Sequence, residues 1–330
     1  PGMLDLHVHG GLGADTMDCS QEAWDQICRF FASRGVTSFL LTTGAASREA
    51  IDEVIEIFQS YHPPQDGAVP LGIHLEGPYL SPQKRGVQPE EHLRNPDPGE
   101  YLPWFESGLV KLMTAAPELP GALEMIQAGR KQGVFFAAGH TTASYDQLLE
   151  AVGIGLNQVS HTFNAMESLH HRRPGALGAA LSDDRIYTQV IADGVHLHPA
   201  VVKILVRSKG PGRTILITDA MRGAGLGDGR YELLGQEIEV AGGEARTREG
   251  ALAGSVLTMD QGLRNVRQFS GVTLSQGIAM ASESPARALD LYPERGALKA
   301  GSRADLIILN EDFQIESVMI GGRMLSPENL

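Results

Sequence analysis

The sequence predicts an α/β fold in which eight parallel strands close into a (β/α)8 barrel of the TIM type. Eight short β-type runs alternate with helical patterns before residue 220, and six of these runs end in His, Glu or Asp. Alternating strands and helices are typical of a parallel sheet. Ionisable side chains are seldom buried unless they are paired or bind a metal. We therefore expect these side chains to meet at the carboxyl-terminal rim of the barrel.

The expected strands are short apolar runs at Met3–His7, Val36–Leu41, Leu71–Leu75, Leu109–Thr114, Val134–Ala138, Gln158–His161, Tyr187–Ala192 and Thr214–Thr218. Ser20 and Ser47 each precede apolar residues spaced at i, i+3, i+4 and i+7, which predicts a capped helix after the first and second strands. Ser144 and Gln147 have the spacing of a capping box and predict a helix after the fifth strand.

The pattern changes after Asp219. A glycine-rich loop follows, and residues 231–247 predict a β-hairpin with Gly242-Gly243 near its turn. Helices are expected near residues 258–269 and 273–281, the second opening with a capping box.

The chain is expected to form two domains. We assign residues 1–295 to the barrel, with the hairpin as an insertion at about 230–250, and residues 296–330 to the C-terminal strands of a small β-sandwich. Such an isolated set of strands needs partner strands to be stable. Because the chain opens directly on a barrel strand, we expect the N-terminal strands of this domain to be missing from the sequence.

The composition of the chain excludes some classes of binding partner and indicates a cellular compartment. The formal charge of −13 argues against nucleic acid or an anionic membrane as a partner. No apolar run reaches about 18 residues, so no transmembrane helix is expected. The first residues lack the pattern of a signal peptide, and Cys19 and Cys28 are expected to be structural thiols, which suits a reducing cytoplasm.

Five strand-end residues are candidate metal ligands. His7 and His9 have strand spacing, so both imidazoles point to the same face and suit zinc or iron. Glu76 can bind one metal or bridge two. His140 and His161 complete a Glu/His/His set, which leaves an open position for water, as in catalytic zinc sites. The alternatives are hydrogen-bonded core histidines and a buried structural ion pair.

Other polar residues are candidates for catalysis and substrate binding. Asp219 can act as a general base and then a general acid, the alternative being a helix N-cap. His196 can donate a hydrogen bond to a substrate oxygen. The loop at 164–175 carries Arg172 and Arg173, whose guanidinium groups suit phosphate or carboxylate, or are simply solvated.

The chain carries, in order over nearly its whole length, the motifs DLHVHG, HLEGPYLSPQKRG, AAGHT, SHTFNAM, RRPGALGA, IADGVH, ITDAM, LAGSVLTM and ADLIIL. In these motifs it resembles the amidohydrolase superfamily and, within it, the N-acetylglucosamine-6-phosphate deacetylases. The resemblance implies a metal-dependent barrel, a small β-sandwich built from both chain ends, and a homodimer. It also implies hydrolysis of the N-acetyl group of the phosphosugar to glucosamine 6-phosphate and acetate, in amino-sugar catabolism.

The resemblance further implies a role for each candidate. Glu76, His140 and His161 would bind the main divalent metal, zinc or iron(II). Some family members lack the HxH pair, so His7 and His9 allow a second ion per subunit. The implied substrate-binding residues are His196, Asn164, Ala165, Arg172, Val87, Leu252, Ala253 and Gly254. Arg172 can reach a neighbouring subunit's site, and Val87-Gln88 stands where the family often has Ala-His.

The implied mechanism is attack of a metal-activated water on the acetamide carbonyl. Asp219 takes the proton of this water, the metal and His196 stabilise the oxyanion, and Asp219 then protonates the leaving amine. Two alternatives stay open: another amidohydrolase, such as an N-acyl-amino-acid deacylase or a cyclic-amide hydrolase, and a metal-binding protein without turnover. The preference between glucosamine and its epimers is also open.

Overall fold

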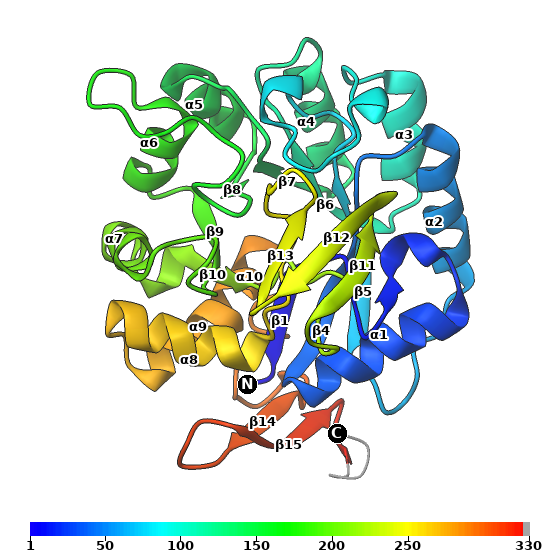
Figure 1. Cartoon of the computed structure of the whole chain (residues 1–330), viewed down its shortest axis with the longest axis vertical. Coiled ribbons are helices and arrows are strands. Elements are labelled where there is room, and N and C mark those ends of the chain that lie inside the picture. Colours follow the sequence, from blue (N-terminus) through cyan, green and yellow to red (C-terminus); the bar gives the residue numbers. More distant parts are fainter. Residues whose placement is uncertain (326–330) are drawn as a thin grey trace.

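The computed structural model describes residues 1–325, in which helices surround a ring of parallel strands (Figure 1). Eight strands hydrogen-bond in chain order, and each lies within two residues of its predicted position. They are β1 (Met3–Val8), β4 (Val36–Thr43), β5 (Val69–Glu76), β6 (Val110–Ala115), β7 (Phe135–Ala138), β8 (Gln158–Val159), β9 (Tyr187–Ile191) and β10 (Thr214–Ile217). The predicted barrel is confirmed.

The ring closes between β10 and β1 at the carboxyl ends of the strands. The backbone N–H of Asp219 donates to the carbonyl of His7 at 2.9 Å, and that of His9 donates to the carbonyl of Ala220 at 2.9 Å. Val8 and Ala220 form an isolated parallel bridge. These contacts bring the first and last polar strand ends together at one rim.

The helices begin where their caps predict. The Ser20 and Ser47 hydroxyls accept backbone N–H groups at the first turns of α1 and α2, and both bonds of the Ser144/Gln147 capping box are present. The helices are α1 (Gln21–Ser33), α2 (Arg48–Ser60), α3 (Pro98–Glu106), α4 (Ala122–Lys131), α5 (Tyr145–Gly153), α6 (Gly175–Ser182), α7 (Pro199–Lys209), α8 (Met259–Ser270), α9 (Leu274–Ala281) and α10 (Glu283–Ala288). Short 3₁₀ turns lie at Thr16–Asp18, Pro82–Lys84, Glu90–His92 and Pro211–Arg213, and two-residue strands at Gly10–Gly11 and Ala14–Asp15.

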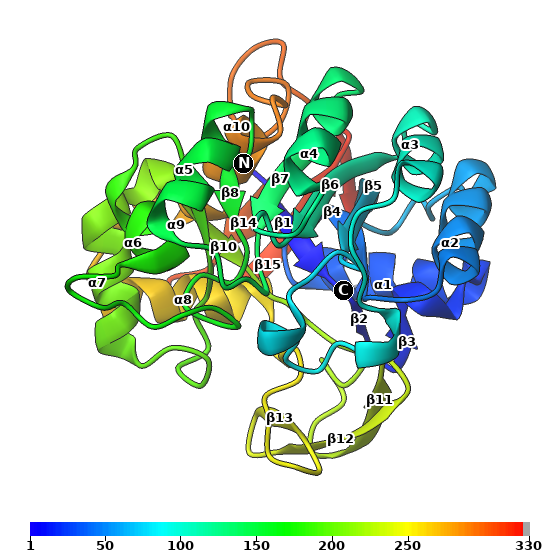
Figure 2. The ribbon, with the colours of Figure 1, turned by 90° about the horizontal axis from the view of Figure 1, so that it is seen from above.

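The insertion is a three-stranded antiparallel sheet of β11 (Gly229–Leu233), β12 (Gln236–Ala241) and β13 (Glu244–Thr247). β12 and β13 form the predicted hairpin with its turn at Gly242-Gly243, and β11 adds a strand that the prediction lacked. The first turn, Leu234-Gly235, has positive φ at both residues, as a type I′ turn needs. Leucine is an unusual residue there, which hides the turn in the sequence. Figures 1 and 2 show the sheet standing in front of one end of the barrel.

A second small antiparallel sheet ends the described chain, formed by β14 (Leu306–Leu309), β15 (Ile315–Ile320) and β16 (Arg323–Leu325). It lies beside the N-terminus (Figure 1), where the N–H of Gly2 donates to the carbonyl of Asp305 at 2.8 Å. The division of the chain at residue 296 stays a prediction, and residues 326–330 of the segment lie outside the described part.

Cys28 is buried on α1, Cys19 is half-buried, and neither forms a disulfide in the described chain. Across residues 1–325, none of the helices has the length and apolar character needed to span a membrane.

Candidate active site

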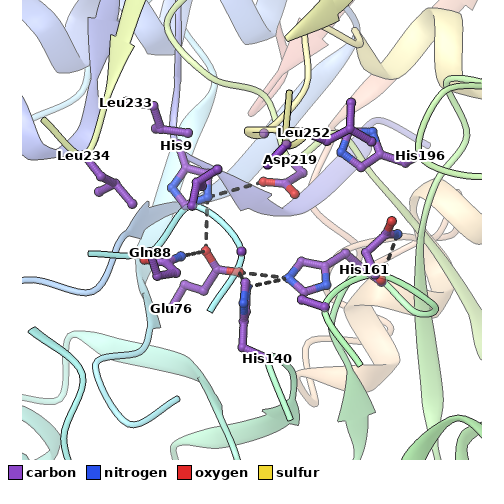
Figure 3. Close-up of a pocket in the computed structure, with 16 residues that line it drawn as sticks. His9, Glu76, Gln88, His140, His161, His196, Asp219, Leu233, Leu234 and Leu252 are labelled. Atoms are coloured by element: carbon purple, nitrogen blue, oxygen red, sulfur yellow. Dashed lines mark hydrogen bonds and ion pairs between the residues drawn. The ribbon is translucent and has the colours of Figure 1, made fainter. Parts of the chain in front are cut away.

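A pocket with a cavity volume of about 240 Å³ opens at the carboxyl-terminal rim of the barrel, where the polar strand ends converge (Figure 3). The structure therefore brings most of the sequence-predicted residues into one place. The lining residues are His9, Glu76, Gly86, Val87, Gln88, His140, His161, Asn164, Ala165, His196, Asp219, Leu233, Leu234, Ala251, Leu252 and Gly254.

Glu76, at the end of β5, is the centre of the cluster. Its Oε1 lies 3.3 Å from Nε2 of His7, 3.2 Å from Nε2 of His140 and 3.0 Å from Nε2 of His161. Its Oε2 lies 3.3 Å from Nε2 of His9. Nitrogen atoms from three different strand ends thus face one buried carboxylate.

The spacing of these atoms fits a divalent metal. Ligand atoms bound tetrahedrally at the usual zinc distances lie about 3.3 Å apart. Two sets of residues have ligand atoms close enough together to bind one ion. One set is Glu76, His140 and His161, and the other is Glu76, His7 and His9. Neither ring nitrogen of the fully buried His7 makes a hydrogen bond, which is costly unless the ring has another ligand.

A hydrogen bond to the backbone fixes the ring orientation of His140. Its Nδ1 lies 2.9 Å from the backbone carbonyl of Lys84, so Nδ1 carries the hydrogen and donates it. Nε2 is then the ring nitrogen left for a metal, and it lies 3.2 Å from Glu76 Oε1 and 3.1 Å from Nε2 of His161. An imidazole oriented in this way by a carbonyl is typical of metal-binding histidines.

Three residues of the pocket have an unusual backbone conformation. His140, His161 and Asp219 have φ values of +48°, +28° and +52°, in the left-handed region that non-glycine residues seldom adopt. Each such residue costs of order 1–3 kcal/mol, and such residues cluster at functional sites. The turn at each strand end directs the side chain toward the others, as Figure 3 shows.

The charges of the cluster depend on one another. Burial opposes ionisation of Glu76, yet the facing imidazoles, His7 first, hold its pKa well below the usual value. Burial opposes ionisation of Asp219 as well, but His7 and His9 lower its pKa to about 2. The same carboxylates outweigh burial and raise the pKa of His9. Two ionised carboxylates here require positive charge, which a divalent cation can supply in place of imidazole protons.

Asp219 and His196 occupy the opposite side of the pocket from His140. Asp219 Oδ1 lies 3.4 Å from Nε2 of His7 and 3.3 Å from Nε2 of His9, so its carboxylate borders both imidazoles. His196 is held by Asp193, whose Oδ2 lies 2.6 Å from Nδ1 of its ring. Burial opposes the charge of His196, but Asp193 raises its pKa.

The substrate-side residues form a polar edge and an apolar wall. Asn164 and Ala165 line the polar edge, where the Asn164 amide donates to the carbonyl of His161 at 3.0 Å. Leu252 lines the wall together with Leu233 and Leu234 of the insertion. The side chain of Ala253 does not line the pocket and is fully buried in the apolar cluster behind it.

Arg172 lies away from this site. Its side chain is exposed and lines a separate hollow beside α5 and α6, together with His170, Arg173 and Tyr145. Within one chain it does not join the metal-ligand cluster. Its contact with a neighbouring subunit's site stays a prediction.

Sequence reasoning did not assign the contacts of Asp193, Gln88, Leu233 and Leu234. Asp193 and Gln88 hold His196 and Glu76 by side-chain hydrogen bonds. Asp193 precedes its histidine by three residues, a spacing that can signal such a pair. The sequence offered no signal for Leu233 and Leu234, because the insertion reaches the pocket only through the tertiary fold.

The comparisons with known proteins agree with this geometry. The model described as "Amidohydrolase family" matches residues 1–325. An N-acetylglucosamine-6-phosphate deacetylase from Bacillus subtilis (strain 168) is 38% identical over 321 residues, 96% of this chain and 81% of the relative. An N-acetylgalactosamine-6-phosphate deacetylase from Escherichia coli O157:H7 is 39% identical over 329 residues, 99% of this chain and 87% of the relative.

A solved structure gives the same result. A mutant N-acetyl-D-glucosamine-6-phosphate deacetylase from Mycobacterium smegmatis, in complex with N-acetyl-D-glucosamine-6-phosphate, is similar with a TM-score of 0.93 and 35% identity. The match covers 98% of this chain and 86% of that chain. The chain therefore belongs to the amidohydrolase family and, within it, to the group that contains the N-acetylglucosamine-6-phosphate deacetylases.

Proposed function

We propose that this protein is a metal-dependent hydrolase that converts N-acetyl-D-glucosamine 6-phosphate to D-glucosamine 6-phosphate and acetate. The observation that carries the proposal is the convergence of Glu76, His140, His161 and Asp219 in one buried pocket. Relatives that bear this activity in their names are similar to the chain over nearly its whole length.

Glu76, His140 and His161 would hold the main metal, and His7 and His9 would share Glu76 with a second. Carboxylate and imidazole ligands suit zinc or iron(II). When bound, such an ion supplies Lewis acidity to the acetamide carbonyl and lowers the pKa of water. The mixed Glu/His set leaves open positions for substrate and water, as catalytic sites need.

Asp219 is suited to move the proton. The positive charge that faces it holds the pKa of Asp219 below its usual value, so the carboxylate is ionised at neutral pH and can accept a proton from the attacking water. The same group, once protonated, can donate to the amine as the C–N bond breaks. Because Asp193 holds Nδ1 of His196, the opposite ring nitrogen remains to donate to the carbonyl oxygen as negative charge develops there.

The pocket walls suit an acetylated sugar. The leucines at 233, 234 and 252 offer an apolar surface for a methyl group, and Asn164 with Ala165 offers polar groups for sugar hydroxyls. In a chain of charge −13, a phosphate needs a local cation, and Arg172 of a second copy would supply one in a homodimer. A reducing cytoplasm suits the two thiols.

N-acetyl-D-galactosamine 6-phosphate is the second candidate substrate, because the Escherichia coli relative named for it is 39% identical. The test is acetate release by metal-reconstituted protein from both phosphosugars, from unphosphorylated N-acetylglucosamine and from an N-acetyl amino acid. Release from N-acetylglucosamine 6-phosphate with the highest kcat/KM supports the proposal. Highest kcat/KM on the epimer favours the second candidate, and release from the amino acid alone overturns both.

A further inference from the structure

Gln88 is a buried side chain in the loop after β5, and it contacts the shared carboxylate directly. Only 2% of the residue is exposed. Its Nε2 donates to Glu76 Oε2 at 2.7 Å, and its Oε1 accepts the backbone N–H of Ala45 at 2.7 Å. The N–H can only donate and the ionised carboxylate can only accept, so these two partners fix the orientation of the amide.

The two oxygens of Glu76 therefore have different surroundings. Oε1 faces the imidazoles of His7, His140 and His161 and receives no amide hydrogen. Oε2 receives the Gln88 amide and faces His9. With Oε2 held, rotation of the carboxylate is restricted, and the lone pairs of Oε1 stay directed at the histidine nitrogens.

We propose that Gln88 is a positioning residue that makes the two metal sites unequal. It presents Oε1 of Glu76 to an ion held with His140 and His161. It also occupies one of the two lone pairs of Oε2, which weakens the contribution of Glu76 to an ion held by His7 and His9. This inference rests on the proposed metal-dependent function.

The chemistry of the side chain supports this role. Glutamine donates a strong hydrogen bond to a carboxylate without carrying a charge, so it orients the ligand and adds no repulsion toward a nearby cation. The neutral amide therefore suits a position beside a shared metal ligand.

The loop has other contacts that do not depend on the Gln88 side chain. The Gln236 side-chain amide donates to the carbonyl of Val87 at 2.6 Å, and the Gln88 N–H donates to the carbonyl of Arg85 at 3.0 Å. Gln88→Leu therefore removes the amide while the loop keeps its backbone anchors. Gln236→Leu is the matched control, because it removes a hydrogen bond of the same loop and leaves Glu76 untouched.

The experiment is a zinc titration of the metal-free full-length protein against a chromophoric chelator, without substrate. For wild type we expect one tight and one weaker zinc ion. In Gln88→Leu the affinity of the tight site should fall about 10–100-fold, the usual effect of removing a partner that orients a metal ligand. The zinc affinities of the two sites should therefore become more similar in Gln88→Leu. In Gln236→Leu both zinc affinities should equal those of wild type.

Cobalt(II) gives a second readout, since its visible absorption reports coordination geometry. The spectrum of the cobalt-loaded protein should change in Gln88→Leu and not in Gln236→Leu. If Gln88→Leu does not fold, as judged by circular dichroism, Gln88→Met offers the same length without a donor.

The outcomes are separable. Unchanged zinc affinities and an unchanged cobalt spectrum in a folded Gln88 variant would overturn the role of Gln88 and leave the metal-dependent function standing. An equal loss in Gln236→Leu would assign the effect to the loop and also overturn it. A wild-type protein that binds no zinc would overturn the proposed metal site itself, and this inference with it.

Discussion

The carboxylate of Asp193 holds His196 at two points. Its Oδ2 lies 2.6 Å from Nδ1 of the His196 ring, and its Oδ1 accepts the backbone N–H of the same residue at 2.8 Å. A histidine held in this way has a fixed ring orientation, a fixed site for one proton and a pKa raised above the usual value.

The first prediction concerns the pH dependence of Asp193→Asn. A raised pKa keeps His196 protonated at higher pH, so loss of the carboxylate should bring deprotonation at lower pH. The basic limb of the kcat/KM profile should therefore shift to lower pH in the variant. The Asp193–His196 pair also stabilises the folded protein. This stabilisation is fully present below the pKa that His196 has in the unfolded chain, and it is lost as the pH rises through the higher pKa of the folded protein. Superimposable profiles for variant and wild type would contradict the role of the pair.

Asp219→Asn tests proton transfer separately from metal binding. The amide cannot accept the proton of the attacking water, so kcat should fall about 10²–10⁴-fold, the range for a lost general acid–base. Zinc content, measured by elemental analysis, should stay at the wild-type value because His140 and His161 remain. Normal turnover with intact metal would rule out Asp219 as the acid–base.

Removal of the metal should lower stability as well as activity. Without a cation, the buried carboxylates of Glu76 and Asp219 depend on imidazole protons for compensation. A ligand at 100 times its Kd adds about 2.7 kcal/mol to the stability of the folded state. Thermal unfolding with and without zinc should show a clear rise in Tm for wild type and a smaller rise for His161→Ala. An identical rise in both proteins would place the bound zinc elsewhere.

The sequence predicted the barrel and the polar side chains that converge at its rim, because both signals are local. A short apolar run followed by a histidine or carboxylate, as at Glu76 or His140, needs no knowledge of distant contacts. The Gln88–Glu76 bond and the pocket contact of Leu234 could not be predicted in this way, because each joins segments that meet only in the folded chain. The position of Arg172 relative to a second copy depends on an interface that one chain does not contain.

The insertion should control substrate affinity through Leu234. A Cβ atom added at the buried Gly44 would lie 2.2 Å from Cδ2 of Leu234, so Gly44→Ala must displace that side chain from the pocket wall. We expect a higher KM for the phosphosugar with unchanged zinc content. Gly212→Ala is the control, since its added Cβ meets no atom within 4 Å. Steady-state kinetics with an unaltered KM in Gly44→Ala would exclude Leu234 from substrate binding.

The last prediction tests whether Arg172 serves the site of a second subunit. Arg172→Ala should raise KM for the phosphosugar and leave the unphosphorylated sugar unaffected, because a guanidinium–phosphate contact is lost. The Arg172→Ala and Asp219→Asn variants should each have low activity on their own. If Arg172 acts across an interface, a hybrid dimer has one site with an intact Asp219 and the partner's intact arginine. Mixing the two variants after partial denaturation and refolding should therefore restore activity. No recovery in a mixture shown to contain hybrids would assign Arg172 to its own chain or to the solvated surface.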